Sequence, residues 1–200
     1  MANFLDQLGL TAEELGIIIE KTPSLRGMIV GYAAEMKLES LWLKPPRFTQ
    51  VIKHDDHDRS QKGDRVCMYK GVELRVECKS LQTNSVRRLK DGSFSGKVQC
   101  DASDRRKIKL PNGSHLETTC LRVGEFDILA VNLIAFRGKW DFIFALNQEL
   151  PRSTYAKYTP LQRRNLLTTL IPVTWPPHPP FTDNLEELAD RVARTRGNYR

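Results

Sequence analysis

Two strongly apolar segments near the middle of the chain constrain the fold more than any other feature. FDILAVNLIAF (126–136) and KWDFIFAL (139–146) lie on either side of Arg137-Gly138. Segments this apolar belong in a core, and a short polar turn between two strand-like segments predicts an antiparallel hairpin. The sequence therefore predicts a buried β-hairpin around which the rest of the chain must pack.

Helices are predicted before the first strand. Thr11 and Glu14 form a capping box in front of a short helix with apolar residues on one side. Thr22 followed by Pro23 provides an N-cap and a proline at the first helical position of a longer helix. The apolar residues of that helix keep helical spacing over about three turns.

The remaining elements complete a mixed pattern. Pro111-Asn112-Gly113-Ser114 predicts the turn of a second hairpin, because Asn-Gly readily takes positive φ angles. The segment PVTWPPHPPF predicts a rigid extended crossing, and Asp183 with Glu186 is the predicted cap of a last helix. Helices at both ends with strands between them predict an α/β fold on the border of α+β, with a mixed central β-sheet flanked by helices.

Length and composition fit one domain over residues 1–200. We expect N-terminal helices over 1–45, a core sheet over 46–150, and a Pro-rich segment with a helix over 151–200. There is no window of about 18 apolar residues, and the first residues lack the pattern of a secretory signal. The four cysteines form no C-x-x-C pair, which disfavours zinc binding. We therefore expect buried reduced thiols, no membrane partner and a cytoplasmic protein.

The charge distribution favours a polyanionic partner. The net charge is +7, and residues 87–109 hold eight basic and three acidic side chains. A charge run of this kind is either a solvated surface or a surface that contacts phosphates. With DNA as the expected partner, the candidate DNA-binding residues are Arg87, Arg88, Arg105, Arg106 and Lys107.

The segment GDRVCMYKGVELRVECKS (63–80) predicts a hairpin with three charged groups at its open end. A two-residue turn at 70–71 would place Asp64 directly opposite Glu77, with Lys79 on the same face. A three-residue turn would match the apolar residues of the two strands better and would move Asp64 away from Glu77. Both registers stay open, because a shift of one residue moves every side chain to the other face.

These three groups suit metal-dependent hydrolysis of a phosphodiester. Two carboxylates about 4 Å apart can bind a hard divalent cation such as Mg²⁺, which prefers oxygen ligands and keeps several waters. A bound cation lowers the pKa of water and stabilises the charge that develops on a phosphate. A nearby lysine can orient or help to deprotonate the attacking water and can offset negative charge.

Asp64 and, after twelve intervening residues, Glu77-Cys78-Lys79 resemble the motif of the PD-(D/E)xK nuclease superfamily. That superfamily includes type II restriction endonucleases and archaeal-type Holliday junction resolvases. The resemblance implies a restriction-endonuclease-like core, with Asp64 and Glu77 as Mg²⁺ ligands, the Cys78 carbonyl as a possible third ligand and Lys79 as the catalytic lysine. It also implies a glutamate on the preceding helix, for which GYAAEMKLES offers Glu35, although an exposed helical glutamate is an equal alternative.

Two features depart from the superfamily pattern. Gly63 stands where the namesake proline would be. The segment SLQTNSVRRLKDGSFSG (80–96) predicts a loop, whereas the superfamily usually has a helix after the motif. The resemblance covers about 20 residues, or about 60 with the preceding helix.

The sequence as a whole favours a Mg²⁺-dependent DNA endonuclease, restriction-like and sequence-specific, that acts as a homodimer because each site cleaves one strand. One alternative is a structure-selective nuclease such as a Holliday junction resolvase. Another is a DNA-binding module on the same fold without catalysis. A third is a structural protein whose hairpin is only a solvated charged face, since Glu73 and Arg75 continue the row of charges.

A second candidate for metal binding is the histidine- and aspartate-rich segment 54–58, HDDHD. Imidazole and carboxylate are transition-metal ligands, but consecutive residues of a polar loop rarely converge on one ion. A solvated loop is therefore the favoured interpretation. Asp56 or Asp58 would replace Asp64 in the motif if the hairpin had the other register.

Overall fold

The computed structural model describes residues 3–53 and 63–197. The chain divides into two compact units, residues 1–33 and residues 34–200. No helix among the described residues is long and apolar enough to cross a membrane.

The first unit is helical. It contains α1 (Phe4–Leu8), α2 (Ala12–Lys21) and the first part of α3 (Pro23–Leu41). The predicted capping box of α2 is confirmed: the Glu14 N–H donates to Thr11 Oγ1 over 3.1 Å, and the Thr11 N–H donates to Glu14 Oε2 over 2.8 Å. These bonds satisfy two of the N–H groups that a helix start leaves without helical partners. The proline predicted to begin the next helix is the first residue of α3.

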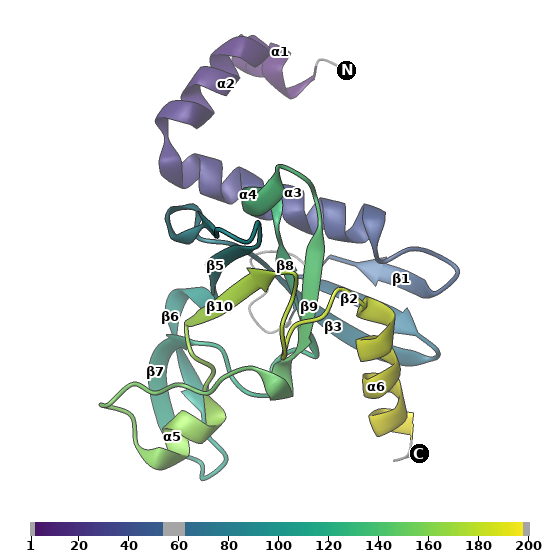
Figure 1. Ribbon diagram of the computed structural model, residues 1–200, viewed down its shortest axis with the longest axis vertical. Helices are drawn as coiled ribbons and strands as arrows, with labels where there is room; N and C mark the ends of the chain where they lie inside the picture. The colour runs from purple at the N-terminus through teal and green to yellow at the C-terminus, as the bar shows by residue number, and fades with distance from the viewer. Residues whose placement is uncertain (1–2, 54–62, 198–200) are drawn as a thin grey trace. The chain divides into compact units, whose positions relative to one another are not determined.

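The second unit is built on a five-stranded sheet with the strand order β1-β2-β3-β8-β9 (Figure 1). Strands β3 and β8 are parallel and the other neighbours are antiparallel, so the sheet is mixed, as predicted. Its strands are β1 (Phe48–Ile52), β2 (Arg65–Tyr69), β3 (Val72–Ser80), β8 (Ile128–Asn132) and β9 (Phe142–Leu146). Strands β8 and β9 are the predicted apolar hairpin, with the short helix α4 (Ile134–Arg137) in the connection.

Different layers cover the two faces of this sheet. On one face, the part of α3 after residue 33 and α6 (Leu185–Gly197) pack against the strands, with Leu38, Val76 and Leu188 in one buried cluster. On the other face, Leu129 of β8 belongs to a second cluster that includes residues of a three-stranded sheet. That sheet has the order β10-β5-β4, formed by β10 (Leu170–Trp175), β5 (Phe94–Gln99) and β4 (Arg87–Arg88). Helices and a second sheet therefore bury the two faces of the central sheet.

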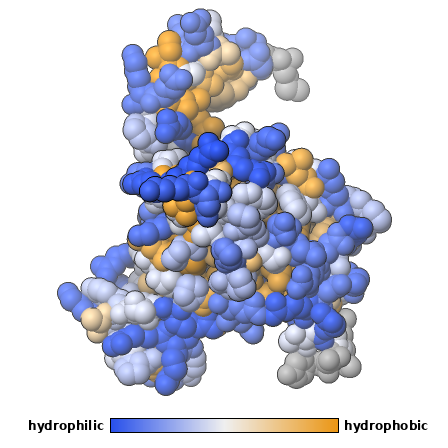
Figure 2. All heavy atoms as spheres, viewed as in Figure 1, coloured by the Kyte–Doolittle hydropathy of each residue, from blue (hydrophilic) through white to orange (hydrophobic). Residues whose placement is uncertain are grey.

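A two-stranded ribbon completes the fold. It consists of β6 (Asp101–Lys109) and β7 (His115–Cys120), joined by the predicted Asn-Gly turn. We call β6 and β7 the ribbon. The short helix α5 (Pro160–Asn165) lies near it in Figure 1, and the surface over this part of the molecule is predominantly hydrophilic in Figure 2.

Three local expectations are corrected by the structure. The last helix is capped by Asn184, whose Oδ1 accepts the Glu187 N–H over 3.1 Å, one position later than the predicted capping box. The segment after the motif is less loop-like than predicted, since it holds a 3-10 helix η1 (Thr83–Ser85) and β4. The start of PVTWPPHPPF belongs to β10, which pairs with β5, because this extended segment finds a sheet edge to hydrogen-bond.

Candidate active site

The register of the motif hairpin is the one that a two-residue turn produces. Tyr69 pairs with Val72, which leaves Lys70 and Gly71 as the turn. Their φ angles are 48° and 77°, in the left-handed region that a tight hairpin turn requires at both central positions. The alternative with a three-residue turn is therefore wrong.

This register brings the charged groups of the motif together. The ladder ends at Arg65 opposite Val76, and Asp64 precedes β2 in a bend in which Gly63 packs close to Arg75 and Val76, so the ladder does not continue to Asp64. The Cys78 N–H donates a hydrogen bond to Asp64 Oδ2 over 2.7 Å. Asp64 thus acts as a side-chain continuation of β2 and is held at the open end of the hairpin.

The position before Asp64 explains one departure from the superfamily pattern. Gly63 has a φ of 84°, and a Cβ atom added there would lie 3.1 Å from the Cβ of Arg75. Proline fixes φ near −65°, so it cannot adopt this backbone conformation. Glycine is the residue that allows this entry into the hairpin.

Glu77 and Lys79 form an ion pair on the same face of β3. Lys79 Nζ lies 2.7 Å from Glu77 Oε1, and the side chains of Lys79 and Glu77 are 23% and 12% exposed, respectively. Burial raises the pKa of the Glu77 carboxyl; Lys79 lowers it and Asp64 raises it, and the net shift is upward. Burial also raises the pKa of the Asp64 carboxyl, against the opposing effects of Lys79 and the Cys78 N–H.

The pKa of Lys79 is shifted in the direction that keeps its side chain charged. Burial by itself disfavours the ammonium form, but the negative charges of Glu77 and Asp64 outweigh burial, so the pKa of Lys79 is raised. Lys79 is therefore an ammonium ion at neutral pH. This protonation state suits a group that orients water or offsets phosphate charge, and it disfavours a role as a base.

Cys78 lies between these residues but presents its side chain to the opposite face. The thiol is buried in the cluster on the helical side of the sheet, and burial raises the pKa of the Cys78 thiol well above its usual value. A protonated thiol is a poor metal ligand. The backbone differs, because the N–H and C=O of one strand residue point to the same edge. Since the Cys78 N–H meets Asp64, its carbonyl also faces this edge, as a third ligand would require.

The donor set suits a cation that needs few protein ligands. In the described ranges 3–53 and 63–197, no three or more histidine, cysteine, aspartate or glutamate side chains are grouped so that they could hold a metal ion together. Mg²⁺ is commonly bound by one or two carboxylates and several waters, so Asp64, Glu77 and a carbonyl are sufficient. Both carboxyl groups have raised pKa values, and a divalent cation beside them would relieve the cost of burying their charge.

The candidate glutamate of the preceding helix is bound to an arginine that sequence analysis missed. Arg65 is 5% exposed, and its guanidinium donates to Glu35 Oε2 and Glu39 Oε2, each over 2.9 Å, and to the Asp64 carbonyl over 2.8 Å. Lys53 Nζ also lies 3.6 Å from Glu35 Oε2. The negative charge of Glu35 contributes to the raised pKa of the Asp64 carboxyl. Glu35 itself pairs with two cations, Arg65 and Lys53. The arrangement makes Arg65 a brace between α3 and the backbone of Asp64.

Replacing Arg65 by methionine is expected to lower the free energy of unfolding by about 3 kcal/mol, because Glu35 would keep a largely buried charge without its main partner. Urea unfolding followed by circular dichroism measures the change. Arg47→Met is the matched control, since Arg47 pairs with Glu186 but is 65% exposed, and its loss should change stability by less than about 1 kcal/mol. Equal effects of the two substitutions would contradict the bracing role of Arg65.

The candidate DNA-binding residues fall into two groups. Arg87 and Arg88 are exposed on β4, where the Arg87 guanidinium donates to the backbone carbonyls of Asn84 and Val86 over 2.9 and 2.8 Å. Arg105 and Lys107 are exposed on β6. Arg106 lies between them in sequence but points to the other side of the ribbon.

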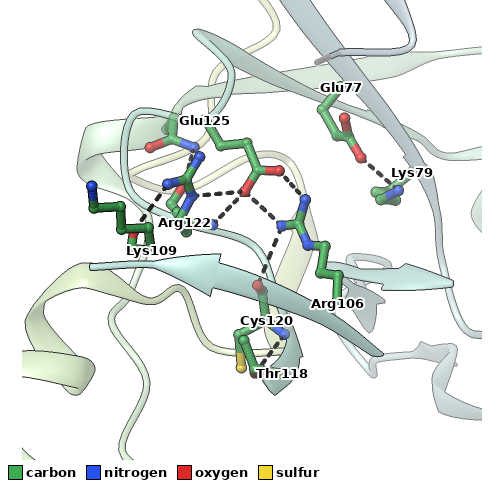
Figure 3. A network of polar contacts seen from close by, with 9 residues as sticks. Glu77, Lys79, Arg106, Lys109, Thr118, Cys120, Arg122 and Glu125 are labelled. Carbon is green, nitrogen blue, oxygen red and sulfur yellow. Dashed lines mark hydrogen bonds and ion pairs between the residues drawn. The ribbon is translucent and has the colours of Figure 1, made fainter. Parts of the chain in front are cut away.

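Arg106 is held by a glutamate that sequence analysis also missed. Its guanidinium forms two hydrogen bonds with the Glu125 carboxylate, and Nη2 donates to the Cys120 carbonyl over 3.4 Å. The Arg122 N–H donates to the same carboxylate over 2.8 Å. Figure 3 shows this network beside the ion pair of Glu77 and Lys79. Glu125 is 6% exposed, and its negative charge contributes to the raised pKa of Glu77.

The segment 54–58, with the replacement candidates Asp56 and Asp58, lies outside the described residues.

Comparisons with known proteins give one weak likeness. No protein-family model matches the sequence, and the search of curated proteins found no match. The solved structure of a bacterial homing endonuclease, I-Ssp6803I, resembles the chain with a TM-score of 0.34 and 18% sequence identity, covering 72% of this chain and 87% of that one. A TM-score of this size does not establish a shared fold.

Proposed function

We propose that this protein is a Mg²⁺-dependent DNA endonuclease of the PD-(D/E)xK type. One observation carries the proposal: Asp64, Glu77 and Lys79 meet at the open end of one hairpin, with Asp64 bonded to the Cys78 N–H and Glu77 paired with Lys79. A solvated strand face would leave such side chains in water. Here Glu77 and Lys79 are largely buried, and the two carboxyl groups have raised pKa values.

Each side chain has a distinct task in this proposal. Asp64 and Glu77 would hold Mg²⁺, with the Cys78 carbonyl as a possible third ligand. Each carboxylate can keep its present contact with one oxygen and use the other for the cation. Bound Mg²⁺ lowers the pKa of water and stabilises charge on a phosphate. Lys79, as an ammonium ion, would orient the attacking water and offset the charge on the phosphate.

The substrate is proposed to be duplex DNA, cut at defined sequences by a homodimer. A net charge of +7 favours a polyanionic substrate. Two copies are needed because each copy carries one such site and a duplex has two strands to cleave.

A panel of substrates tests this function. Purified protein is incubated with supercoiled plasmid, mixed genomic DNA and a synthetic four-way junction, each with about 10 mM Mg²⁺, an excess over a weak carboxylate site, or with EDTA. Discrete fragments of genomic DNA that need Mg²⁺ are the expected result. Cleavage of the junction alone would replace this proposal by a structure-selective nuclease. Salt-dependent DNA binding without cleavage in any divalent metal would replace it by a binding module.

A further inference from the structure

The two faces of the ribbon differ sharply in burial. From residue 105 to residue 110, exposed and covered side chains alternate along the end of β6 and the residue after it: Arg105, Lys107 and Lys109 are exposed, whereas Ile108 and Leu110 are buried. Strand β7 continues the pattern, with His115 opposite Lys109 and Glu117 opposite Lys107. We call the side that carries these exposed residues and Thr119 the outer face of the ribbon.

The inner face of the ribbon packs against and hydrogen-bonds to other parts of the second unit. Ile108, Leu110 and Cys120 form a buried cluster with Leu166, which follows α5. Thr118 Oγ1 lies 2.7 Å from the hydroxyl oxygen of Tyr158. Arg106 adds the two hydrogen bonds to Glu125 described above. These contacts fix the ribbon, so its outer face has a defined orientation.

The outer face has the chemistry of a surface that reads nucleic acid. Strand β6 supplies a row of three cations at every second residue, about 7 Å apart along the strand. Strand β7 supplies His115, Glu117 and Thr119, whose side chains can hydrogen-bond to base edges. A carboxylate in the middle of a basic surface weakens simple phosphate binding, but it can accept a hydrogen bond from the amino group of cytosine.

We propose that the outer face of the ribbon binds in the major groove of duplex DNA. This inference rests on the proposed function and names the element that recognises the substrate. A B-DNA major groove is about 12 Å wide and admits a two-stranded β-ribbon. The basic side chains of β6 meet phosphates at the edge of the groove, and the polar side chains of β7 face the bases.

The ribbon lies in the same part of the second unit as the proposed site of cleavage. Glu125 holds Arg106 of the ribbon through two hydrogen bonds. Figure 3 shows this pair beside the ion pair of Glu77 and Lys79.

A binding experiment without cleavage tests the ribbon. The affinity of the full chain for a labelled mixed-sequence duplex of about 30 base pairs is measured in EDTA over a series of salt concentrations. The ribbon variant carries Arg105→Ala, Lys107→Ala and Lys109→Ala. The control variant removes the same charge from the region of β1, β2 and α6, away from the ribbon in Figure 1, by replacing the exposed residues Arg47, Lys70 and Arg194 with alanine.

The ribbon variant is expected to bind at least about tenfold more weakly at low salt, with a log–log salt slope shallower by about 2 to 3. The affinity of the control variant should stay within about threefold of that of the wild type, because this variant loses the same net charge but keeps the ribbon side chains that contact DNA. In a duplex whose cytosines carry glucosylated hydroxymethyl groups, these groups fill the major groove, whereas the phosphates are unchanged. The wild type should bind this duplex at least about tenfold more weakly than the unmodified one.

Two results would overturn the ribbon proposal while leaving the proposed function intact: a ribbon variant that binds like the control, or equal affinity for the glucosylated and unmodified duplexes. A wild-type protein that binds neither duplex would overturn the proposed function together with it. Unchanged melting temperatures of the two variants establish that both are folded.

Discussion

Replacing Glu77 by glutamine is expected to reduce Mg²⁺-dependent DNA cleavage by about a thousandfold or more. Loss of a ligand weakens the cation that stabilises charge on the phosphate, a contribution of several kcal/mol to the transition state. The melting temperature in EDTA should be unchanged or higher, because burial and repulsion from Asp64 make the charged form of Glu77 costly in the fold. Plasmid cleavage and thermal unfolding measure the two effects.

A substitution of Glu73 is the matched control for the Glu77 variant, because Glu73 occupies the same face of β3 but is exposed. Glu73→Gln should cleave at the wild-type rate and melt at the wild-type temperature. Addition of Mg²⁺ should raise the melting temperature of the wild type and of this control, but not that of Glu77→Gln. Wild-type cleavage by the Glu77 variant would show that the site has been assigned to the wrong residue.

Replacing Lys79 by methionine is expected to slow cleavage by about a hundredfold to a thousandfold, the usual cost of removing one group that stabilises transition-state charge. In contrast to the Glu77 variant, this protein should be less stable in EDTA, by about 1–3 kcal/mol. The reason is that Glu77 and Asp64 lose the ammonium ion that compensates their buried charges. Single-turnover cleavage and urea unfolding provide the two measurements.

Lys70→Met serves as the control for the Lys79 variant. Lys70 lies in the turn of the same hairpin and pairs with Asp190, but its side chain is 62% exposed. Its loss should change stability by less than about 1 kcal/mol and leave cleavage unaffected. If Lys79→Met were as stable and as active as Lys70→Met, the pair of Glu77 and Lys79 would be an ordinary salt bridge with no catalytic role.

The motif hairpin was predictable as a hairpin, but its register was not, because both turn lengths were open. The two-residue Lys-Gly turn fixes the register in the structure, and the hydrogen bond from the Cys78 N–H holds Asp64 at the open end. The apolar match that favoured a longer turn misled because it considered only the hairpin. Cys67 lies opposite Leu74, and together with Tyr69 it completes the face that packs on the helices. The central strands were likewise predictable from their continuous apolar segments.

The ion pairs of Arg65 and Arg106 beside the site were not predictable, because the partners in each pair are distant in sequence. Arg65 meets Glu35 across 30 residues, and Arg106 meets Glu125 across 19. In the sequence, Arg65 looks like a surface residue at the start of a strand, and Arg106 looks like one more cation in a basic stretch. The signal that existed was alternation: both residues fall on the inward-facing side of their strands, where a charged side chain needs a buried partner.

Cleavage of supercoiled plasmid by the wild type and by Asp64→Asn, each in Mg²⁺ and in EDTA, tests whether Asp64 holds a cation that the cleavage reaction needs. Asparagine keeps a side-chain oxygen that can accept the Cys78 N–H but removes the charge that a cation needs. We expect the wild type to nick and linearise the plasmid only in Mg²⁺, and we expect Asp64→Asn, with an unchanged melting temperature, to leave it supercoiled. Cleavage in EDTA, or cleavage by Asp64→Asn at the wild-type rate, would contradict the role of Asp64 as a ligand of a catalytic cation.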